Sequence, residues 1–302
     1  MQTEFDLKKI KDIVHLAINE DIGTGDITSS IFIPEGSESE GVLIAKEAGV
    51  VAGLPVAEYV LSQIDKDLIF KVNIEDGSRV EKGSVIAVVK GLTISLLSAE
   101  RLVLNFLQRL SGIATATNKF AEKVEGHKTQ ILDTRKTTPG WRYLEKYAVK
   151  IGGGANHRIG LYDHILIKDN HLEIMEQEKE NGDIGSLVKK ARKQITNEVL
   201  IEVEVEDLCQ IKEMVDAGVD IILFDNMAPT KIKEAVEMVK ECKNSRDAGS
   251  VRSILTEASG NISIENVEEY AKAGVDRISV GMITHSARAL DISFDISNKV
   301  ML

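Results

Sequence analysis

The sequence predicts an α/β protein whose C-terminal half folds as a parallel α/β barrel, complete or incomplete. Two observations support this fold class. From residue 128 onward, short apolar runs alternate with amphipathic helical stretches, as where VLIEVEV precedes DLCQIKEMVDAGV. Repeated strand–helix units of this kind form a parallel sheet that helices cover. No Gly-rich dinucleotide-binding fingerprint follows the first of these strands, so a nucleotide-binding open sheet is disfavoured.

The region before residue 128 has a different pattern. Residues 7–18 place apolar side chains at helical spacing. Residues 41–91 are β-rich with tight turns at Asp76–Gly77 and Lys82–Gly83, and a helix is expected to start at Pro55. A single apolar stripe along SLLSAERLVLNFLQRLSGIATATNKFAEKV predicts a long helix that links two domains. We expect the final segment, THSARALDISFDISNKVML, to return to the N-terminal domain.

The composition restricts the possible functions. The 302-residue chain carries a formal net charge of −11, which argues against nucleic acid as the main partner. No apolar run approaches membrane-spanning length and the N-terminus lacks a signal-peptide pattern, so we expect a cytoplasmic protein with no membrane partner. Cys209 and Cys242 have neither metal-binding spacing nor a disulfide framework, and we assign them no role.

Polar residues follow the predicted barrel strands at one end. In α/β barrels the active site lies where strands end and the loops to the helices begin. A charged side chain inside an apolar strand costs several kcal/mol if it is unpaired, so a site explains a whole set of such residues better than separate structural ion pairs do. The set is Asp133, Arg135 and Lys136, then Lys168, Glu202, Glu204, Asp225, Asn226, Glu257, Ser259, Gly260, Asn261, Ser279 and Gly281.

A basic cluster overlaps this set. Such a cluster on an acidic protein favours a small polyanion, because the surrounding field repels a large one. We therefore expect a substrate with several carboxylates or phosphates. The cluster comprises Arg135, Lys136, Arg142, His157, Arg158 and Lys168.

The glutamates of IEVEV can be placed by strand alternation. Side chains alternate along a strand, so Glu202 and Glu204 share a face while the valines share the other. Glu204 lies closer to the C-terminal end of the strand and is the better ligand candidate, but the sequence leaves open whether it or Glu202 is the ligand. With Asp225 it offers two carboxylates, and carboxylates that face a phosphate-bearing substrate require Mg²⁺ between them.

Two Gly-containing strand ends come last in the barrel. Loops after the final barrel strands commonly hold a phosphate through backbone N–H groups. Ser259-Gly260-Asn261 and Ser279-Val280-Gly281 are therefore candidates for a phosphate site.

Together these residues resemble the quinolinate phosphoribosyltransferase family. The resemblance covers nearly the whole chain in order, through EDIGTGDIT, SAERLVLNFLQRLSGIAT, DTRKTTPGWRYLEKYAV, GGGANHRIGLYDHILIKDNH, EVEV, LFDN, EASGNI and ISVGMITHS. It implies an N-terminal α/β sandwich over residues 1–112, joined by the tail 285–302, and an incomplete parallel α/β barrel of the TIM-like kind over residues 113–284. It also implies a homodimer with shared active sites, which can assemble into a higher oligomer.

The resemblance implies a reaction and roles for particular residues. Quinolinate and phosphoribosyl pyrophosphate would give nicotinate mononucleotide, pyrophosphate and CO₂ on the way to NAD. Lys136 would stabilise charge at the reacting centre, and Glu204 and Asp225 would hold the ribose and the Mg²⁺–pyrophosphate. The implied quinolinate-binding residues are Arg101 from the neighbouring subunit, Thr134, Arg135, His157, Arg158 and Lys168, and the implied 5′-phosphate residues are Ser259, Gly260, Asn261, Ser279, Val280 and Gly281.

Three other readings stay open from the sequence. A paralogue of the same fold, such as the molybdenum-associated homologue, would act on another aromatic acid or base. A Schiff-base lyase would use Lys168, which lies on a predicted barrel strand where such lysines occur. A catalytically silent barrel would only bind a metabolite, although the intact acids and bases at the strand ends argue against that.

Overall fold

The computed structural model describes residues 5–168, 170–171, 173–174, 184–196, 198–244 and 253–297. The chain divides into two compact units. The first, which we call the antiparallel unit, comprises Met1–Asn118, Lys136–Gly154 and Met282–Leu302, and the second, the parallel unit, comprises Lys119–Arg135 and Ala155–Gly281. In the part of the chain that the structure describes, no helix is both long and apolar enough to cross a bilayer.

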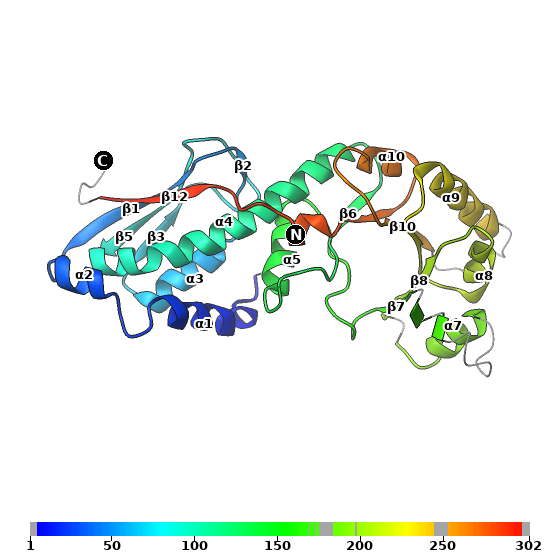
Figure 1. Ribbon diagram of the computed structural model, residues 1–302, viewed down its shortest axis with the longest axis horizontal. Helices are drawn as coiled ribbons and strands as arrows, with labels where there is room; N and C mark the ends of the chain where they lie inside the picture. The colour runs from blue at the N-terminus through cyan, green and yellow to red at the C-terminus, as the bar shows by residue number, and fades with distance from the viewer. Residues whose placement is uncertain are drawn as a thin grey trace. The chain divides into compact units, whose positions relative to one another are not determined.

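The antiparallel unit is built on a four-stranded sheet in the order β12-β1-β5-β3. The central strands β1 (Glu38–Ala45) and β5 (Val85–Leu92) pair with each other, and β3 (Ile69–Val72) pairs with β5. The C-terminal strand β12 (Ile292–Ser297) pairs with β1, so chain segments far apart in sequence form one sheet (Figure 1). Residues 298–302 of the predicted returning tail lie outside the described residues.

Helices accompany this sheet, and aspartates cap the first turns of two of them, α2 and α3. Asp26 accepts the Ser29 backbone N–H at the start of α2, and Asp76 accepts the N–H groups of Gly53 and Leu54 at the start of α3. The helices of this unit are α1 (Lys11–Asp21), α2 (Ile27–Phe32), α3 (Leu54–Ile64), α4 (Thr93–Lys123), α5 (Arg142–Ile151) and α11 (Met282–His285), after the short helix η1 (Leu7–Lys9); a small second sheet pairs β2 (Gly49–Val50) with β4 (Arg79–Val80).

The parallel unit contains a six-stranded sheet in the order β6-β11-β10-β9-β8-β7. Its strands are β6 (Gln130–Leu132), β7 (Ile165–Ile167), β8 (Ile201–Val205), β9 (Ile221–Asp225), β10 (Leu255–Ser259) and β11 (Arg277–Ser279), and every pairing is parallel. The first two strands along the chain form the two edges. The predicted fold class, an incomplete parallel α/β barrel with an N-terminal α/β domain, is confirmed.

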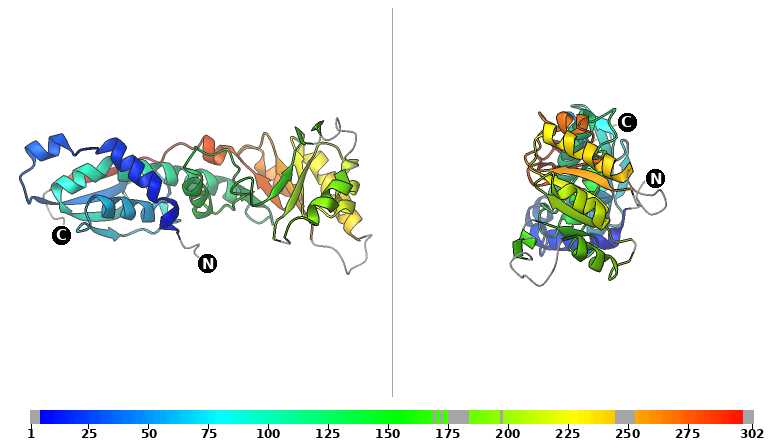
Figure 2. Two further views of the ribbon diagram at one scale, coloured as in Figure 1. Left: turned by 90° about the horizontal axis from the view of Figure 1, so that it is seen from below. Right: turned by 90° about the vertical axis from the view of Figure 1, so that its right-hand side faces the viewer.

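Helices cover the outside of the parallel sheet. Helices α7 (Ile184–Arg192), α8 (Gln210–Ala217) and α9 (Pro229–Asn244) lie side by side in chain order, and α10 (Val267–Lys272) packs against α9 and β11 (Figures 1 and 2). The alternating residues Val203, Ile222 and Phe224 are fully buried, as strands in a helix-covered parallel sheet require.

Candidate active site

The polar residues of the parallel sheet share one face. Hydrogen-bonded partners on neighbouring parallel strands point to the same side, and Glu257 of β10 is paired with Leu223 of β9 and with Arg277 of β11. Leu223 is also the partner of Glu204 on β8. Alternation then places further polar residues on this face, and they are Lys168, Glu202, Asp225, Ser259 and Ser279.

Asp133 fixes the loop that carries His157 and Arg158. It is fully buried, directly after β6, and accepts hydrogen bonds from the Asn156 side chain at 2.6 Å and from the His157 backbone N–H at 2.9 Å. Ala155 forms a parallel bridge with Leu132, so the loop begins alongside the edge strand β6. The sequence therefore presents His157 and Arg158 next to the strand end.

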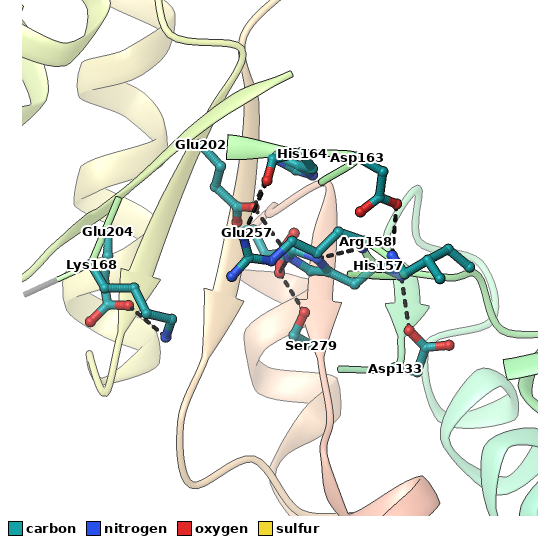
Figure 3. Close-up of polar contacts among 11 residues, drawn as sticks. Asp133, His157, Arg158, Asp163, His164, Lys168, Glu202, Glu204, Glu257 and Ser279 are labelled. Atoms are coloured by element: carbon teal, nitrogen blue, oxygen red, sulfur yellow. Dashed lines mark hydrogen bonds and ion pairs between the residues drawn. The ribbon is translucent and has the colours of Figure 1, made fainter. Parts of the chain in front are cut away.

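His157 lies between two buried glutamates. Its Nε2 is 3.1 Å from Glu202 Oε2 and 3.4 Å from Glu257 Oε1, and its Nδ1 accepts the Arg158 backbone N–H at 2.7 Å (Figure 3). Burial opposes a charged ring, but contact with the two carboxylates outweighs it and raises the pKa of His157 to about 9. The hydrogen bond from Arg158 to Nδ1 favours the neutral ring. With Nδ1 as the acceptor, the neutral ring carries its proton on Nε2, which faces the carboxylates, so this form of the ring has no N–H left for a substrate.

His164 stacks on His157 and remains neutral. The ring centroids are 5.4 Å apart at an interplanar angle of 12°, and His164 Nε2 is 3.2 Å from Glu202 Oε2. Burial, together with the nearby charges of His157 and Arg158, lowers the pKa of His164 to about 4. Glu202 thus lies against one imidazole ring with a raised pKa and one with a lowered pKa. The pKa of Glu202 itself is raised by burial and by the charge of Glu257.

Arg135 and Arg158 form the cationic part of the site. Arg158 Nη1 donates to the His164 backbone carbonyl at 3.1 Å. Burial and the nearby charge of Arg135 both lower the pKa of Arg158. Two guanidinium groups close enough to repel each other favour an anion with several acceptor oxygens, because Arg binds carboxylates and phosphates in a bidentate manner.

Glu204 and Glu202 lie on the same strand but differ in burial and in their partners. Glu204 Oε2 lies 3.2 Å from the ammonium of Lys168, whose side chain is 46% exposed. Glu202 is fully buried and lies at ion-pair distance from the two imidazole rings. Of the two glutamates that the sequence left open as ligands, Glu204 is therefore the one at the solvent-accessible end.

The ends of β9 and β10 form a compact turn cluster. Asn226 and Asn261 adopt left-handed backbone angles, with φ of 52° and 50°, and Asn261 Nδ2 donates to Asn226 Oδ1 at 3.0 Å. Gly260 lies between the two strands with φ of 89°, and a Cβ there would clash with the Asn226 side chain. The Asp225 carboxylate accepts from Asn226 Nδ2 at 2.5 Å and is partly exposed at this edge.

Two of the predicted phosphate donors have other partners. The Ser279 hydroxyl is buried and donates to Glu257 Oε1. The Val280 backbone N–H donates to the Leu132 carbonyl at 2.9 Å, as an extension of the β11–β6 ladder. Of the other predicted phosphate-site residues, Ser259, Gly260 and Gly281 are partly exposed and Asn261 is exposed.

Three predicted residues belong to the antiparallel unit. Arg101 lies on α4 with its side chain 61% exposed, and its guanidinium is 3.9 Å from the Glu100 carboxylate. Lys136 follows Arg135 directly and is exposed, and its backbone carbonyl accepts the Thr284 hydroxyl at 2.8 Å. Arg142 of the predicted basic cluster also belongs to this unit, where its Nε donates to the Thr137 hydroxyl at 3.0 Å, whereas Thr134 and the other predicted site residues belong to the parallel unit.

Sequence reasoning missed the supporting residues of the loop. Asp163 accepts the backbone N–H groups of Ile159 and Gly160, which closes the turn between His157 and His164. His164 gave no signal, because a histidine before an apolar run reads as exposed or structural. Glu257 was predicted as a strand-end residue from the sequence, but its contact with His157 was not.

A metal ion does not fit the histidine cluster. Ligand atoms of His157, His164 and Glu202 lie within 4.8 Å of one another. A metal on His157 Nε2 would need that nitrogen deprotonated, and a metal-bound histidine normally donates a hydrogen bond from its other ring nitrogen. Here Nδ1 accepts a hydrogen bond instead, and Arg158 adds positive charge beside the ring. The cluster is therefore a polar network of the protein.

The fold and the anion-binding residues together define an α/β phosphoribosyltransferase of the incomplete-barrel type. Comparisons with known proteins agree with this class. The model of the quinolinate phosphoribosyl transferase C-terminal domain matches residues 113–295, and that of the N-terminal domain matches residues 26–111. The chain belongs to the quinolinate phosphoribosyltransferase family.

Full-length relatives show the same likeness. The chain is 42% identical over 290 residues to a probable nicotinate-nucleotide pyrophosphorylase (carboxylating) of Bacillus subtilis, covering 96% of this chain and 94% of the relative. It is 38% identical over 301 residues to the corresponding protein of Mycobacterium leprae, covering 98% and 100%. The solved nicotinate-nucleotide pyrophosphorylase of Francisella tularensis superposes with a TM-score of 0.87 at 37% identity, covering 97% of this chain and 98% of that one.

Proposed function

We propose that this chain transfers the phosphoribosyl group of phosphoribosyl pyrophosphate to quinolinate and releases CO₂, giving nicotinate mononucleotide and pyrophosphate for NAD biosynthesis. The observation that carries the proposal is that Arg135, Arg158 and Lys168 all lie at the C-terminal end of one parallel sheet, with Arg135 close enough to Arg158 to affect its pKa. The family membership and the full-length relatives support the same reaction.

Quinolinate is a pyridine with two adjacent carboxylates, and the cationic residues match that charge. The guanidinium groups of Arg135 and Arg158 would each take carboxylate oxygens, which relieves their mutual repulsion. The Lys168 ammonium would either leave the Glu204 carboxylate to bind a substrate carboxylate, or bind the substrate while it keeps its contact with Glu204. Thr134 would contribute a hydroxyl beside Arg135. In its neutral form the His157 ring has no N–H to spare, so in that form its contribution to quinolinate binding would be indirect.

The substrate supplies its own nucleophile. The pyridine nitrogen attacks C1 of the ribose, pyrophosphate leaves with the electrons of the broken C–O bond, and the carboxylate next to the ring nitrogen departs as CO₂ while a proton takes its place. The chain would supply positioning and charge stabilisation rather than a covalent nucleophile. Lys136 would stabilise charge near the reacting centre, and Glu204 and Asp225 would orient the ribose.

Mg²⁺ would enter with the pyrophosphate. Glu204 and Asp225 lie on neighbouring strands and on one face of the sheet, so both carboxylates can approach one ion. Glu204 already contacts Lys168, so these two groups alone make a weak site, and Mg²⁺ usually keeps water and substrate oxygens among its ligands. The 5′-phosphate would lie at Ser259, Gly260, Asn261 and Gly281.

We further propose a homodimer in which Arg101 of one subunit completes the quinolinate site of the other. Support comes from its exposure and from its weak contact with the Glu100 carboxylate, at the long distance of 3.9 Å. A cytoplasmic location stays an expectation.

The other readings receive less support. A Schiff-base lysine must act as a neutral amine, whereas Lys168 contacts a carboxylate that favours its ammonium form. A paralogue acting on another aromatic acid would have no need for two guanidinium groups so close together. Borohydride trapping of substrate on Lys168 would favour the lyase.

A product assay tests the proposed reaction. The chain would be incubated with phosphoribosyl pyrophosphate, Mg²⁺ and quinolinate labelled in the carboxylate next to the ring nitrogen. We expect equal amounts of released labelled CO₂ and nicotinate mononucleotide, and neither without phosphoribosyl pyrophosphate. Absence of both products from folded protein would contradict the proposal.

A further inference from the structure

The buried polar cluster behind Arg158 is unusual for the interior of an α/β sheet. It runs from His164 through Glu202, His157 and Glu257 to Ser279 (Figure 3). Six buried side-chain N or O atoms in the described residues have no hydrogen-bond partner, and five of them belong to Arg158, His164, Glu202 and Glu257. The energetic cost of buried polar groups is thus concentrated at one place.

Such a cluster reduces stability rather than increasing it. A buried carboxylate without full hydrogen bonding costs several kcal/mol, and apolar side chains of similar volume are often more stable in the same place. Apolar residues do occupy other positions of this face, as Ile221 and Leu223 show. A cost of this size indicates that the two glutamates serve the site, and a metal ion does not account for them, because His157 Nδ1 accepts a hydrogen bond.

We propose that Glu202 and Glu257 are positioning residues: their carboxylates hold the His157 ring in one orientation, and the ring in turn fixes Arg158 for the substrate carboxylate. The inference rests on the proposed function of the site and names the buried residues on which its specificity depends.

Each link of this chain is a direct contact. The His157 main chain is held by Asp133, so only the ring is left to orient. The carboxylates of Glu202 and Glu257 face one edge of the ring at Nε2, and the opposite nitrogen, Nδ1, takes the Arg158 backbone N–H. The Arg158 guanidinium has its second anchor at the His164 carbonyl.

The consequence of losing the carboxylates follows from this geometry. Without an acceptor at Nε2 the ring can rotate, and the hydrogen bond from the Arg158 backbone to Nδ1 is lost. Arg158 then keeps a single anchor, and misplacement of a binding group by a fraction of an ångström weakens the contact with its anion. The effect falls on the quinolinate side of the site, because neither His157 nor Arg158 belongs to the strand ends that are proposed to hold the phosphate.

The test compares two substitutions at Glu202. Glu202→Met keeps length and volume but removes both carboxylate oxygens, whereas Glu202→Gln keeps one oxygen that can face Nε2. We expect Glu202→Met to raise the KM for quinolinate about 10- to 100-fold, as loss of an orienting partner does elsewhere. The KM for phosphoribosyl pyrophosphate should change less than about threefold. In Glu202→Gln the KM for quinolinate should be close to that of the unaltered chain. Glu206→Gln, an exposed glutamate on the same chain segment, is the matched control and should leave both values unchanged.

Equal effects on both substrates, or Glu202→Gln as impaired as Glu202→Met, would overturn the proposal, since either result indicates general damage or a need for charge. An unchanged quinolinate KM in folded Glu202→Met would overturn it as well. Tight binding of zinc to the unaltered chain, lost in Glu202→Met, would replace the positioning role by a metal site.

A second measurement needs no variant to fold and no enzymatic activity. Nitrogen NMR of the unaltered chain, labelled in histidine, should show His157 with a proton on Nε2. A ring protonated on Nδ1 alone would contradict the geometry. If the chain is inactive with quinolinate but this signature is present, the proposed function fails and the network stands; if the chain is active and Glu202→Met behaves normally, the network alone fails.

Discussion

His164 shows how a single buried side chain makes stability depend on pH. Its pKa falls to about 4 in the folded chain, against 6.5 for an ordinary histidine, because it is buried beside His157 and Arg158. As pH falls from 6.5 towards 4, the unfolded chain therefore takes up a proton at this position and the folded chain does not. Stability is lost over that window through linkage.

Replacing His164 by Gln should remove this loss. The free energy of unfolding, measured by urea denaturation at pH 7 and pH 5, should fall less for His164→Gln than for the unaltered chain, by on the order of 1–2 kcal/mol. His285→Gln, at an exposed histidine, is the control and should keep the original pH dependence. Parallel slopes for His164→Gln and the unaltered chain would show that His164 titrates normally.

Residues at the strand ends could be predicted from the sequence, whereas their partners could not. Alternation in IEVEV correctly placed Glu202 and Glu204 on one face, because the period of a strand is local. It could not tell that Glu202 meets two imidazole rings and Glu204 meets Lys168, since these contacts depend on the path of the loop at residues 155–164. The roles of the individual site residues stay predictions.

At the scale of elements, a buried ion pair supports the loop that carries Lys136. Arg109 on α4 donates to the fully buried Glu145 on α5 at 2.8 Å and to the Thr284 and Ala287 carbonyls. Glu145 also accepts the Thr138 hydroxyl at 2.9 Å. The two helices and the loop are thus tied at one point within the antiparallel unit.

Breaking this pair should destabilise the chain. Glu145→Gln leaves the Arg109 guanidinium without its charged partner, and removal of one member of a buried pair typically costs about 3–5 kcal/mol. Glu237→Gln removes an exposed partner of Lys240 and should change the free energy of unfolding by less than about 1 kcal/mol. Urea denaturation of both variants measures the contrast, and equal effects would show that burial of the Arg109–Glu145 pair has no consequence.

Local pattern predicted many strands and helices but not how they group. The apolar runs IEVEV and IILFD became β8 and β9 as expected, because strand length and composition are local properties. Helix α5, with the sequence RYLEKYAVKI, lies within residues 113–284, which the resemblance assigns to the barrel, yet it groups with the antiparallel unit. Its neighbours explain this: Trp141 stacks on Phe106, and Tyr147 donates to Asp76. Such long-range contacts do not produce a periodic pattern in the sequence, so they could not be predicted from it. The predicted domain boundary at residue 112 stays a prediction.

At the scale of the whole molecule, the proposed shared site makes two inactive variants complementary. An Arg101→Ala chain lacks the residue given to the neighbour, and a Lys136→Ala chain lacks a residue of its own reacting centre. Mixed dimers should regain one working site each, so activity should return after subunit exchange to about a quarter of the original level for equal amounts. Mixtures that stay inactive although exchange is demonstrated by mass spectrometry would argue against sharing.

The most direct measurement is the ratio of kcat/KM for quinolinate to that for nicotinate. Nicotinate lacks the second carboxylate, so it leaves part of the Arg135 and Arg158 pair without a partner, and sites built for such a group reject the analogue strongly. We predict a preference for quinolinate of at least about 10³-fold, which Arg158→Ala should largely remove by raising the KM for quinolinate. Comparable kcat/KM values for the two acids in the unaltered chain would contradict the proposal that this site reads both carboxylates of quinolinate.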